Sequence, residues 1–356
     1  MNIFVLVEEP YEIHQNPFVR TLMESITSQH NDVSWGYGLS IFWDERILEY
    51  DIIHIHWPDI FTWYNDSNLT NTNVFEERLK YIKSKGIKII TTCHNLKPHY
   101  SDNELRIKVY DIAYNNSDCI IHLGKFSLDL FEKKYPKKNN CLLMHHIYET
   151  IYTQLPTREE SINKLRLDPS QKYILCFGAF RGDEERNLII QLAKYLKGRK
   201  VNILAPSFYK VPRSKNPRIV LKPLLRFLYY KFKYPNIKIN RDYYVNDEML
   251  SYYYGASSIS LIQRTKILNS GNVSLGFYMK NIVVGPNVGN VGTWLEETQN
   301  PTFNPNDINS LYRAIDFALK NNDKGMENHL YATKELNVRK ISSELYYIYK
   351  KTIQMK

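Results

Sequence analysis

Two arginines and a polar turn in the second half of this 356-residue chain are suited to binding phosphate. Arg181 and Arg186 carry planar guanidinium groups, whose fixed N–H donors match the oxygens of a phosphate. The turn, which precedes a short apolar run, consists of Asn269, Ser270, Gly271 and Asn272. Asn, Ser and Gly can open a helix and leave its first backbone N–H groups free, at the positive end of the helix dipole. We therefore expect the turn to form an anion site.

A second group of polar and aromatic side chains lies at predicted strand ends in the first half of the chain. It consists of His14, His56, Trp57, Asp59 and His94. An imidazole exchanges protons near neutral pH, a carboxylate can act as a general base, and an indole can stack against a sugar ring. Glu8 and Glu9, which follow the first predicted strand, are further candidates for a carboxylate base.

The histidines do not match a metal-binding motif. The chain has no His-Glu-x-x-His and no Asp-x-Asp arrangement. The pairs His54/His56 and His145/His146 are close in sequence but lack the additional ligands that a metal site requires. We therefore expect no metal ion.

An alternation of strands and helices positions the candidate residues of the first half. Strands are predicted at 1–7, 51–58, 87–92, 119–123 and 140–145. A helix is predicted to start at Asn16–Pro17, and further helices are predicted at 74–85, 104–115 and 126–134. Alternation of this kind predicts a parallel sheet with helices on both faces.

The same alternation restarts after a polar, helix-prone connector at 150–170. Strands are predicted at 173–178, 200–205, 237–239, 258–262 and 282–284. Helices are predicted at 187–197, 247–254, 306–320 and 338–353. The chain is thus expected to be an α/β protein of two Rossmann-like, doubly wound parallel sheets that face a cleft. Ligands of such sheets bind at the carboxyl ends of the strands.

The composition is that of a globular protein, with 43% hydrophobic and 24% charged residues. The four cysteines are scattered, which favours a reducing compartment and, with it, a cytoplasmic location. The apolar N-terminus meets Glu8 at once, so we expect a first β-strand there rather than a signal peptide. No apolar run approaches the roughly 20 residues that span a bilayer. The net charge of +10 indicates an anionic partner.

Residues 207–233 interrupt the α/β pattern with a basic and aromatic segment. The segment contains no acidic residue, and its cations are Lys210, Arg213, Lys215, Arg218, Lys222, Arg226, Lys231 and Lys233. Its aromatic residues include Phe208, Tyr209, Phe227, Tyr229, Tyr230 and Phe232. This composition fits an interfacial contact with the anionic inner face of the plasma membrane. It equally fits a solvated insertion whose aromatic rings pack on the domain.

Four blocks of the second half follow one another in a recognisable order. They are 177–181 with 186–188, 239–257, 269–289 and 303–307. In this order they resemble the donor-sugar domain of GT-B glycosyltransferases, in the large group 1 superfamily. The first half agrees more loosely, through 51–58 and 91–95.

The resemblance implies a metal-independent glycosyltransferase that moves a sugar from a nucleoside-diphosphate sugar to a saccharide or lipid-linked acceptor, in surface-polysaccharide assembly. It implies that Arg181, Arg186 and the turn 269–272 bind the diphosphate of the donor, which is a co-substrate; no other cofactor is expected. His94 would lie near the transferred sugar, and we expect His94, Arg181 and Asp59 to be catalytic. His14, His56 and Trp57 would bind the acceptor.

The chain departs from the family at two places. The two glutamates that the family separates by seven residues fall at Ile267 and Leu275, which leaves ribose recognition without a residue. The family's lysine in the basic block falls at Glu184, with Arg181 and Arg186 as substitutes. The sequence does not decide between inversion, which needs a carboxylate base such as Asp59, Glu8 or Glu9, and retention.

Two other classes of protein remain open. Nucleotide-sugar epimerases share the two-domain plan, but they would need an acid pair that the sequence does not identify. A nucleic-acid-binding protein would fit the net charge of +10, yet no recognition motif occurs and the charge concentrates in one segment, so we expect no nucleic acid.

We divide the chain into an acceptor-binding domain at 1–155 and a nucleotide-sugar-binding domain at 165–335, with the basic insertion at 207–233. A C-terminal helix at 336–356 is expected to cross back to the first domain.

Overall fold

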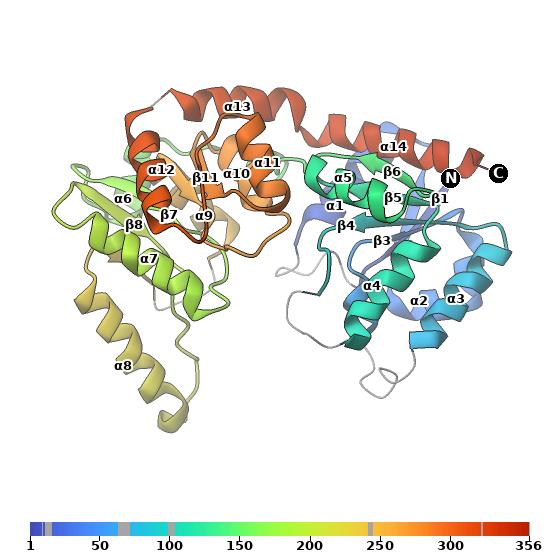
Figure 1. The fold of residues 1–356 in the computed structure, drawn as a ribbon, viewed down its shortest axis with the longest axis horizontal. Helices are drawn as coiled ribbons and strands as arrows, with labels where there is room; N and C mark the ends of the chain where they lie inside the picture. The colour runs from blue at the N-terminus through green and yellow to red at the C-terminus, as the bar shows by residue number, and fades with distance from the viewer. Residues whose placement is uncertain are drawn as a thin grey trace. The chain divides into compact units, whose positions relative to one another are not determined.

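The computed structural model describes residues 1–8, 10, 16–62, 72–98, 104–240, 245–321 and 323–355 (Figure 1). The chain divides into two compact units. The first comprises Met1–His146 and Leu336–Lys356, and the second comprises Ile147–Glu335.

The first unit is built on a six-stranded sheet of the order β2-β1-β3-β4-β5-β6, counted over the described residues. Every pair of neighbouring strands is parallel. The strands are β1 (Asn2–Leu6), β2 (Ser34–Tyr37), β3 (Ile52–Ile55), β4 (Lys88–Cys93), β5 (Cys119–His122) and β6 (Asn139–Leu142). The order reverses between β1 and β3, so the carboxyl ends of these two strands flank the point where ligands of such sheets bind.

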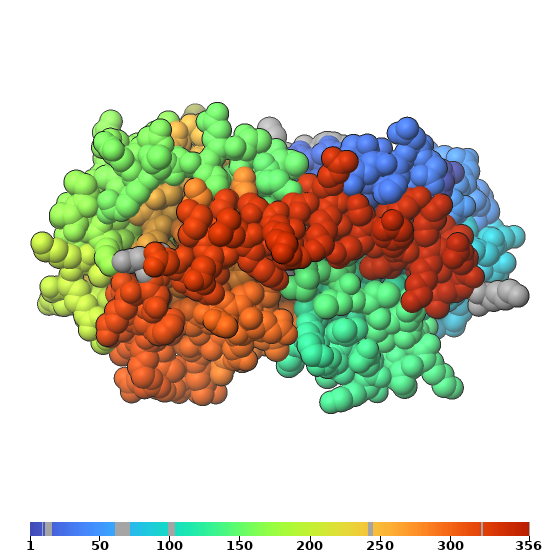
Figure 2. All heavy atoms as spheres, turned by 90° about the horizontal axis from the view of Figure 1, so that it is seen from above, coloured from blue at the N-terminus to red at the C-terminus, as the bar shows by residue number. Residues whose placement is uncertain are grey.

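Helices and short 3₁₀ turns cover the first sheet. They are α1 (Phe18–Gln29), α2 (Leu39–Trp43), η1 (Glu45–Glu49), η2 (Pro58–Thr62), α3 (Thr72–Ser84), α4 (Glu104–Asn116), α5 (Lys125–Lys134) and α14 (Val338–Gln354). Although α14 comes from the end of the chain, it packs on α1, as the red and blue surfaces in Figure 2 show. Ser342 Oγ contacts Ser25 Oγ at 2.8 Å and accepts a hydrogen bond from Gln29 at 2.7 Å. The C-terminal helix is therefore part of the first unit.

The second unit has a six-stranded sheet of the order β12-β11-β10-β7-β8-β9, again parallel throughout in the described part of the chain. Its strands are β7 (Lys172–Leu175), β8 (Val201–Leu204), β9 (Ile237–Lys238), β10 (Ile259–Leu261), β11 (Ile282–Pro286) and β12 (Thr302–Phe303). Its helices are α6 (Arg158–Leu165), α7 (Asp183–Tyr195), α8 (Pro217–Lys233), α9 (Asp247–Ala256), α10 (Gly271–Tyr278), α11 (Gly289–Glu297), α12 (Ile308–Lys320) and α13 (Lys324–Glu335). Here the strand order reverses between β7 and β10.

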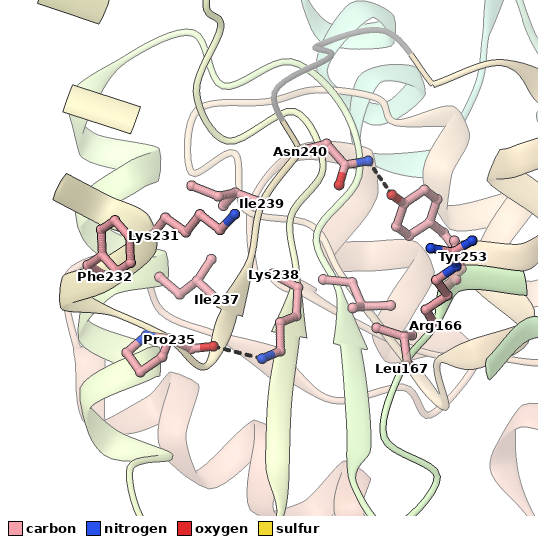
Figure 3. A pocket seen from close by; sticks show the side chains of 12 residues that line it. Arg166, Leu167, Lys231, Phe232, Pro235, Ile237, Lys238, Ile239, Asn240 and Tyr253 are labelled. Atoms are coloured by element: carbon pink, nitrogen blue, oxygen red, sulfur yellow. Dashed lines mark hydrogen bonds between the residues drawn. The ribbon is translucent and has the colours of Figure 1, made fainter. Parts of the chain in front are cut away.

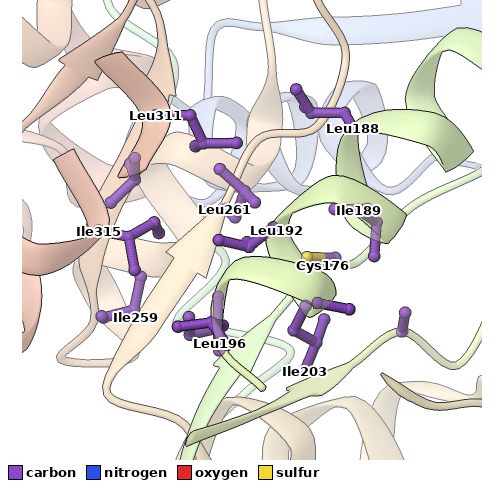
Figure 4. Close-up of a cluster of buried hydrophobic side chains, with 14 of the residues drawn as sticks. Cys176, Leu188, Ile189, Leu192, Leu196, Ile203, Ile259, Leu261, Leu311 and Ile315 are labelled. Atoms are coloured by element: carbon purple, nitrogen blue, oxygen red, sulfur yellow. The ribbon is translucent and has the colours of Figure 1, made fainter. Parts of the chain in front are cut away.

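Aliphatic side chains from both faces of the strands form the core of the second unit. Leu192 of α7 and Ile315 of α12 pack over Ile259 and Leu261 of β10, as Figure 4 shows. On the other face, α10 approaches β11 so closely that a Cβ at Gly276 would lie 2.7 Å from Val283 Cγ2. Glycine at position 276 thus lets α10 pack closely on β11 and β10.

The prediction of two Rossmann-like parallel sheets is confirmed, and each predicted strand is present with its ends shifted by a few residues. The prediction that α7 starts at 187 is wrong, because the helix begins at Asp183. Asp183, Glu184 and Glu185 fill its first turn, where the helix dipole favours acidic side chains. The predicted connector at 150–170 contains a regular helix, α6, which begins with a capping box between Thr157 and Glu160.

Candidate functional site

The strand-order reversal of the second unit brings together the loops that follow β7 and β10. The loop after β7 is tied to its neighbours through the carbonyl of Phe177. This oxygen accepts hydrogen bonds from Asn272 Nδ2 at 2.9 Å and from Gln263 Nε2 at 3.4 Å. Gly178, with φ of +108°, gives the loop a backbone conformation that side-chain-bearing residues rarely adopt. The amide of Asn272 therefore holds the β7 loop against the start of α10.

A buried carboxylate joins the same two loops. Glu185 is 7% exposed and accepts a hydrogen bond from the backbone N–H of Arg181 at 2.6 Å. Its other oxygen lies 3.4 Å from Arg264 Nε, in the loop after β10. Arg264 also donates to the carbonyl of Ala179 at 3.4 Å, and its side chain is 20% exposed. A guanidinium is thus fixed at the strand-order reversal, with part of its surface open to solvent.

A second, exposed ion pair lies beside the first. Glu184 accepts hydrogen bonds from Thr265 Oγ1 at 3.3 Å and from Lys266 Nζ at 3.4 Å. The Lys266 side chain is 86% exposed, so its ammonium can exchange Glu184 for an incoming anion at little cost.

Arg181 and Arg186 occupy different surroundings. Arg181 is exposed at the end of the loop after β7, while the Arg186 side chain is only 18% exposed. The guanidinium of Arg186 donates to the carbonyls of Phe208 at 3.1 Å and Phe180 at 3.0 Å, and it pairs with Asp183 at 3.3 Å. These contacts give Arg186 a role in holding loops together. Its predicted role as a diphosphate ligand stays a prediction, as does that of Arg181.

The predicted phosphate turn leads directly into α10. Ser270 is the residue before the first turn, and its side chain makes no capping hydrogen bond. The first turn of α10 therefore lacks the usual side-chain cap, although the N–H of Val273 bonds the Ser270 carbonyl at 3.1 Å. Asn269 Oδ1 accepts a hydrogen bond from Asn290 of α11 at 2.7 Å, which fixes the turn from its other side.

The structure also explains one departure from the family pattern. Leu275, where the second family glutamate would fall, is 4% exposed and belongs to the buried side of α10. An ionised carboxylate at that place would lose its hydration without a partner. Ile267, at the first position, is half-buried in the loop after β10.

Histidines line the carboxyl edge of the first sheet. His56 follows β3 and is 2% exposed, whereas His94 follows β4 and is half-buried. The two rings share a hydrogen bond of 3.0 Å between His56 Nδ1 and His94 Nε2. The indole of Trp57 stacks on His94, with ring centroids 4.6 Å apart. The structure thus brings three of the predicted residues into contact at the strand-order reversal of the first unit.

A third histidine links this edge to the C-terminal helix. His54 lies on β3 with its ring 4.1 Å from that of His56. Its Nδ1 lies 2.6 Å from the hydroxyl of Tyr349 on α14, and its Nε2 lies 2.8 Å from Thr92 Oγ1. Burial lowers the pKa of His54 to about 3, and it lowers the pKa of His56 well below its usual range. Both rings are therefore neutral hydrogen-bonding groups at physiological pH.

Phe18, the first residue of α1, lies among the histidines. Its ring centroid is 5.3 Å from that of His94 and 4.7 Å from that of His145. It also stacks on His146 at 4.9 Å, whose Nε2 lies 3.2 Å from the Phe18 carbonyl. Burial lowers the pKa of His145 to about 3. The sequence analysis identified His145 and His146 only as an unsuitable metal pair, and it missed that they follow β6 at the same sheet edge.

Asp59 and His14 complete the predicted set. Asp59, on η2, accepts a hydrogen bond from the hydroxyl of Tyr110 on α4 at 2.9 Å. His14 and the alternative base Glu9 lie outside the residues that the structure describes. Within the described ranges, no group of three or more His, Cys, Asp or Glu side chains could hold a metal ion.

Arg264 and Lys266 are the residues of the second unit that the sequence analysis missed. Both directly follow the predicted strand 258–262, so the rule that ligands bind at carboxyl strand ends applied to them as well. Both lie between the blocks 239–257 and 269–289, in a segment that the family resemblance does not cover.

Solved structures match nearly the whole chain. Sucrose-phosphate synthase (tll1590) from Thermosynechococcus elongatus is 14% identical with a TM-score of 0.72, and the match covers 98% of both chains. Alr3699/HepE from Anabaena, in complex with UDP-glucose, is 11% identical with a TM-score of 0.67, covering 99% of this chain and 100% of that one. A Listeria monocytogenes protein assigned as a UDP-N-acetylglucosamine 2-epimerase is 11% identical with a TM-score of 0.57, covering 100% and 97%. By sequence, no family model and no curated protein matches the chain.

At these identities the likeness defines the fold. The chain has the two-domain GT-B fold, so the fold that was expected from the order of the sequence blocks is confirmed.

Proposed function

We propose that this protein is a glycosyltransferase that moves a sugar from a nucleoside-diphosphate sugar to a saccharide or lipid-linked saccharide acceptor. The observation that carries the proposal is the strand-order reversal of the second unit. There the uncapped first turn of α10 follows a loop that carries Arg264 and Lys266, and Asn272 ties this turn to the loop that ends in Arg181. Backbone N–H groups with two or three cations suit a diphosphate. The fold neighbour Alr3699/HepE was solved with UDP-glucose.

The chemistry of glycosyl transfer fits this arrangement. When the bond to the sugar breaks, negative charge grows on the departing diphosphate. Amides at a helix N-terminus and a fixed guanidinium stabilise that charge without having to reorganise. Arg264, held by Glu185 and by the carbonyl of Ala179, is such a preorganised group. We assign the diphosphate to Arg181, Arg264, Lys266 and the 269–272 turn, and we propose that this binding needs no metal ion.

The histidine edge of the first unit suits uncharged sugar hydroxyls. Neutral imidazoles both donate and accept hydrogen bonds, and an indole presents a flat apolar face to a sugar ring. We propose that His94 contacts the transferred sugar, that His56, Trp57 and His14 contribute to acceptor binding, and that Asp59 is the candidate base. We further propose a cytoplasmic enzyme of surface-polysaccharide assembly. No described helix is long and apolar enough to cross a membrane.

A thermal-shift screen against UDP, GDP, ADP and CMP sugars tests the proposal. A donor at 100 times its Kd should stabilise the protein by about 2.7 kcal/mol, which raises the melting temperature selectively. Arg264→Ala should weaken donor binding by about 10- to 100-fold, because a charge-assisted contact is lost. Arg313→Ala is the matched control, since Arg313 is an arginine of the same unit that is 70% exposed and pairs with Asp307 on the surface. The absence of a shift with every nucleotide would contradict the proposal.

An epimerase is the second candidate, because one of the fold neighbours carries that assignment. An epimerase converts its nucleotide sugar without an acceptor, whereas a transferase releases the nucleoside diphosphate only as the sugar is transferred. Incubation of the identified donor with the protein alone, followed by NMR of the sugar, separates the two. A new epimer that forms without release of the nucleotide would replace the transferase proposal.

A further inference from the structure

The basic segment of the second unit forms a helix with an apolar row that the unit does not cover. Leu221 and Leu225 of α8 are each 58% exposed, and Phe232 is 77% exposed. With half-buried Leu228 they are spaced by four, three and four residues, so they follow one side of the helix. Figure 1 shows α8 projecting from the second unit. A row of large apolar side chains in water is unfavourable unless a partner covers it.

A row of cations runs beside the apolar row. Arg218, Lys222 and Arg226 are spaced by four residues, and Lys233 continues the row by one more helical turn after Tyr229. The Arg226 guanidinium lies 5.7 Å from the ring centre of Tyr209, and Lys233 hydrogen-bonds the Tyr229 hydroxyl. No Asp or Glu occurs in 207–233, so nothing within the segment neutralises these charges.

The remaining side of α8 is anchored to the domain. Phe227 is 5% exposed, and the ring of Tyr230 lies 5.3 Å from that of the buried Phe208. The two interpretations of 207–233, a membrane contact and an insertion whose rings pack on the domain, therefore apply to different residues. Phe208, Phe227 and Tyr230 pack on the unit, whereas Leu221, Leu225 and Phe232 do not.

A pocket of about 420 Å³ adjoins the C-terminal end of the apolar row (Figure 3). Lys231 and Phe232 of α8 line one side of it, and Lys238 of the edge strand β9 and Arg166 line the rest together with apolar residues. Three cations and no acidic side chain contribute to its lining. The apolar row of α8 is thus bordered by positive charge on both sides.

We propose that α8 anchors the protein on an anionic lipid bilayer. The helix lies in the membrane plane, with Leu221, Leu225 and Phe232 at the boundary between headgroups and acyl chains. Arg218, Lys222 and Arg226 contact lipid phosphates, and the pocket between α8 and β9 receives one headgroup. Charge complementarity selects this partner, because an apolar row bordered by cations without acids matches an anionic membrane surface. The proposal stands independently of the nucleotide-sugar site.

Co-sedimentation of the full chain with vesicles tests the proposal. Binding is expected to vesicles of phosphatidylglycerol and phosphatidylcholine in equal parts, and not to phosphatidylcholine alone. Arg218→Gln with Lys222→Gln should lower the partition coefficient about 30-fold, since each cation near an anionic surface contributes about fivefold. Leu221→Ser with Leu225→Ser should lower it at least about tenfold. Leu330→Ser on α13, where the leucine is 62% exposed, and Arg313→Gln are the matched controls and should bind as the natural sequence does.

Three other results would contradict membrane binding by α8. Binding that ignores lipid charge, or variants that bind like the natural sequence, would overturn the proposal. So would a dimer in sedimentation equilibrium that Leu221→Ser with Leu225→Ser converts to a monomer, because a second copy would then cover the row. Lys231→Gln with Lys238→Gln should weaken vesicle binding about tenfold or more. If these two substitutions abolish binding of inorganic phosphate but leave vesicle binding unchanged, the headgroup assignment of the pocket is wrong.

Discussion

The two units have sheets of the same kind, yet the side chains at their carboxyl edges differ in chemistry. At the strand-order reversal of the first sheet, between β1 and β3, the strand ends carry His56, Trp57 and, one strand further, His94. At the reversal of the second sheet, between β7 and β10, they carry Arg264 and the buried Glu185 that holds it. The backbone arrangement is shared, so the edge residues alone set which ligand each unit suits.

The histidine distribution sharpens the contrast. Nine of the ten histidines fall within residues 1–146, and His329 is the one in the second unit. Burial keeps several of the nine neutral, which suits hydroxyl groups and excludes a strong attraction to anions. The second unit presents permanent positive charge. The two edges therefore differ in charge, and this is the difference that the proposed division between an uncharged sugar and a diphosphate requires.

The largest expected difference between the units is their sensitivity to acid. Burial lowers the pKa of His54 and His145 to about 3 and that of His122 to about 4, against about 6.5 in the unfolded chain. Below pH 6.5 the unfolded state binds these protons and the folded state does not, so the stability present above pH 6.5 is lost as the pH falls towards 4. At pH 5 each of these histidines should lower the free energy of unfolding by about 2 kcal/mol, and the three together should lower it by about 6 kcal/mol.

Urea unfolding at pH 7.5 and pH 5 measures this difference. In Trp294→Phe the remaining tryptophans all belong to the first unit, so their fluorescence reports on that unit alone. The midpoint for the first unit should fall strongly at pH 5. Hydrogen exchange of the second unit serves as the internal control and should change much less. Equal destabilisation of both units would show that the buried histidines do not set the acid response.

A crossed pair of substitutions separates the two edges in function. His94→Ala should lower kcat about 100-fold while leaving the nucleotide thermal shift unchanged, because a positioned hydrogen-bonding group contributes about that much to the transition state. Arg264→Ala should mainly weaken donor binding and so reduce the nucleotide thermal shift. His30→Ala controls for the loss of a histidine in the first unit, since His30 stacks on Tyr346 of α14 rather than at a strand end. A loss of nucleotide binding in His94→Ala would contradict the division of roles.

The comparison also shows what the sequence could reveal. Buried strands such as Ile52–Ile55 and Ile282–Pro286 are continuous apolar runs, and their order alone predicts parallel sheets. Strand β2, in contrast, reads Ser-Trp-Gly-Tyr and was not predicted. It lies at the sheet edge, and a Cβ at Gly36 would displace the ring of Tyr50, whose hydroxyl lies against the glycine. That constraint arises from a residue fourteen positions away and leaves no local pattern.

The candidate sites also contain contacts that follow from the sequence pattern and contacts that only the fold produces. The strand-end rule places His56, Trp57 and His94 at one edge of the sheet, and they are in contact there because the carboxyl ends of β3 and β4 adjoin. The rule could not show that Arg186 donates hydrogen bonds to the carbonyls of Phe180 and Phe208, because only the fold brings Phe208 close to Arg186. Contacts within a sheet edge follow from strand order, whereas contacts between loops depend on side-chain geometry.

The smallest effect should come from the amide that ties the phosphate turn to the neighbouring loop. Asn272→Ala removes the hydrogen bond from Nδ2 to the Phe177 carbonyl, 2.9 Å in length, but leaves the backbone N–H of residue 272 in place. The β7 loop, with Gly178 at φ of +108°, would keep the weaker contact from Gln263 at 3.4 Å. We expect a loss of about 1 kcal/mol in stability and donor binding weakened about fivefold, measured by urea unfolding and by the nucleotide thermal shift. Asn309→Ala on α12 is the matched control. If Asn272→Ala abolishes donor binding while stability is unchanged, the side chain itself contacts the donor, and the second edge recognises its ligand through a neutral amide as well as through charge.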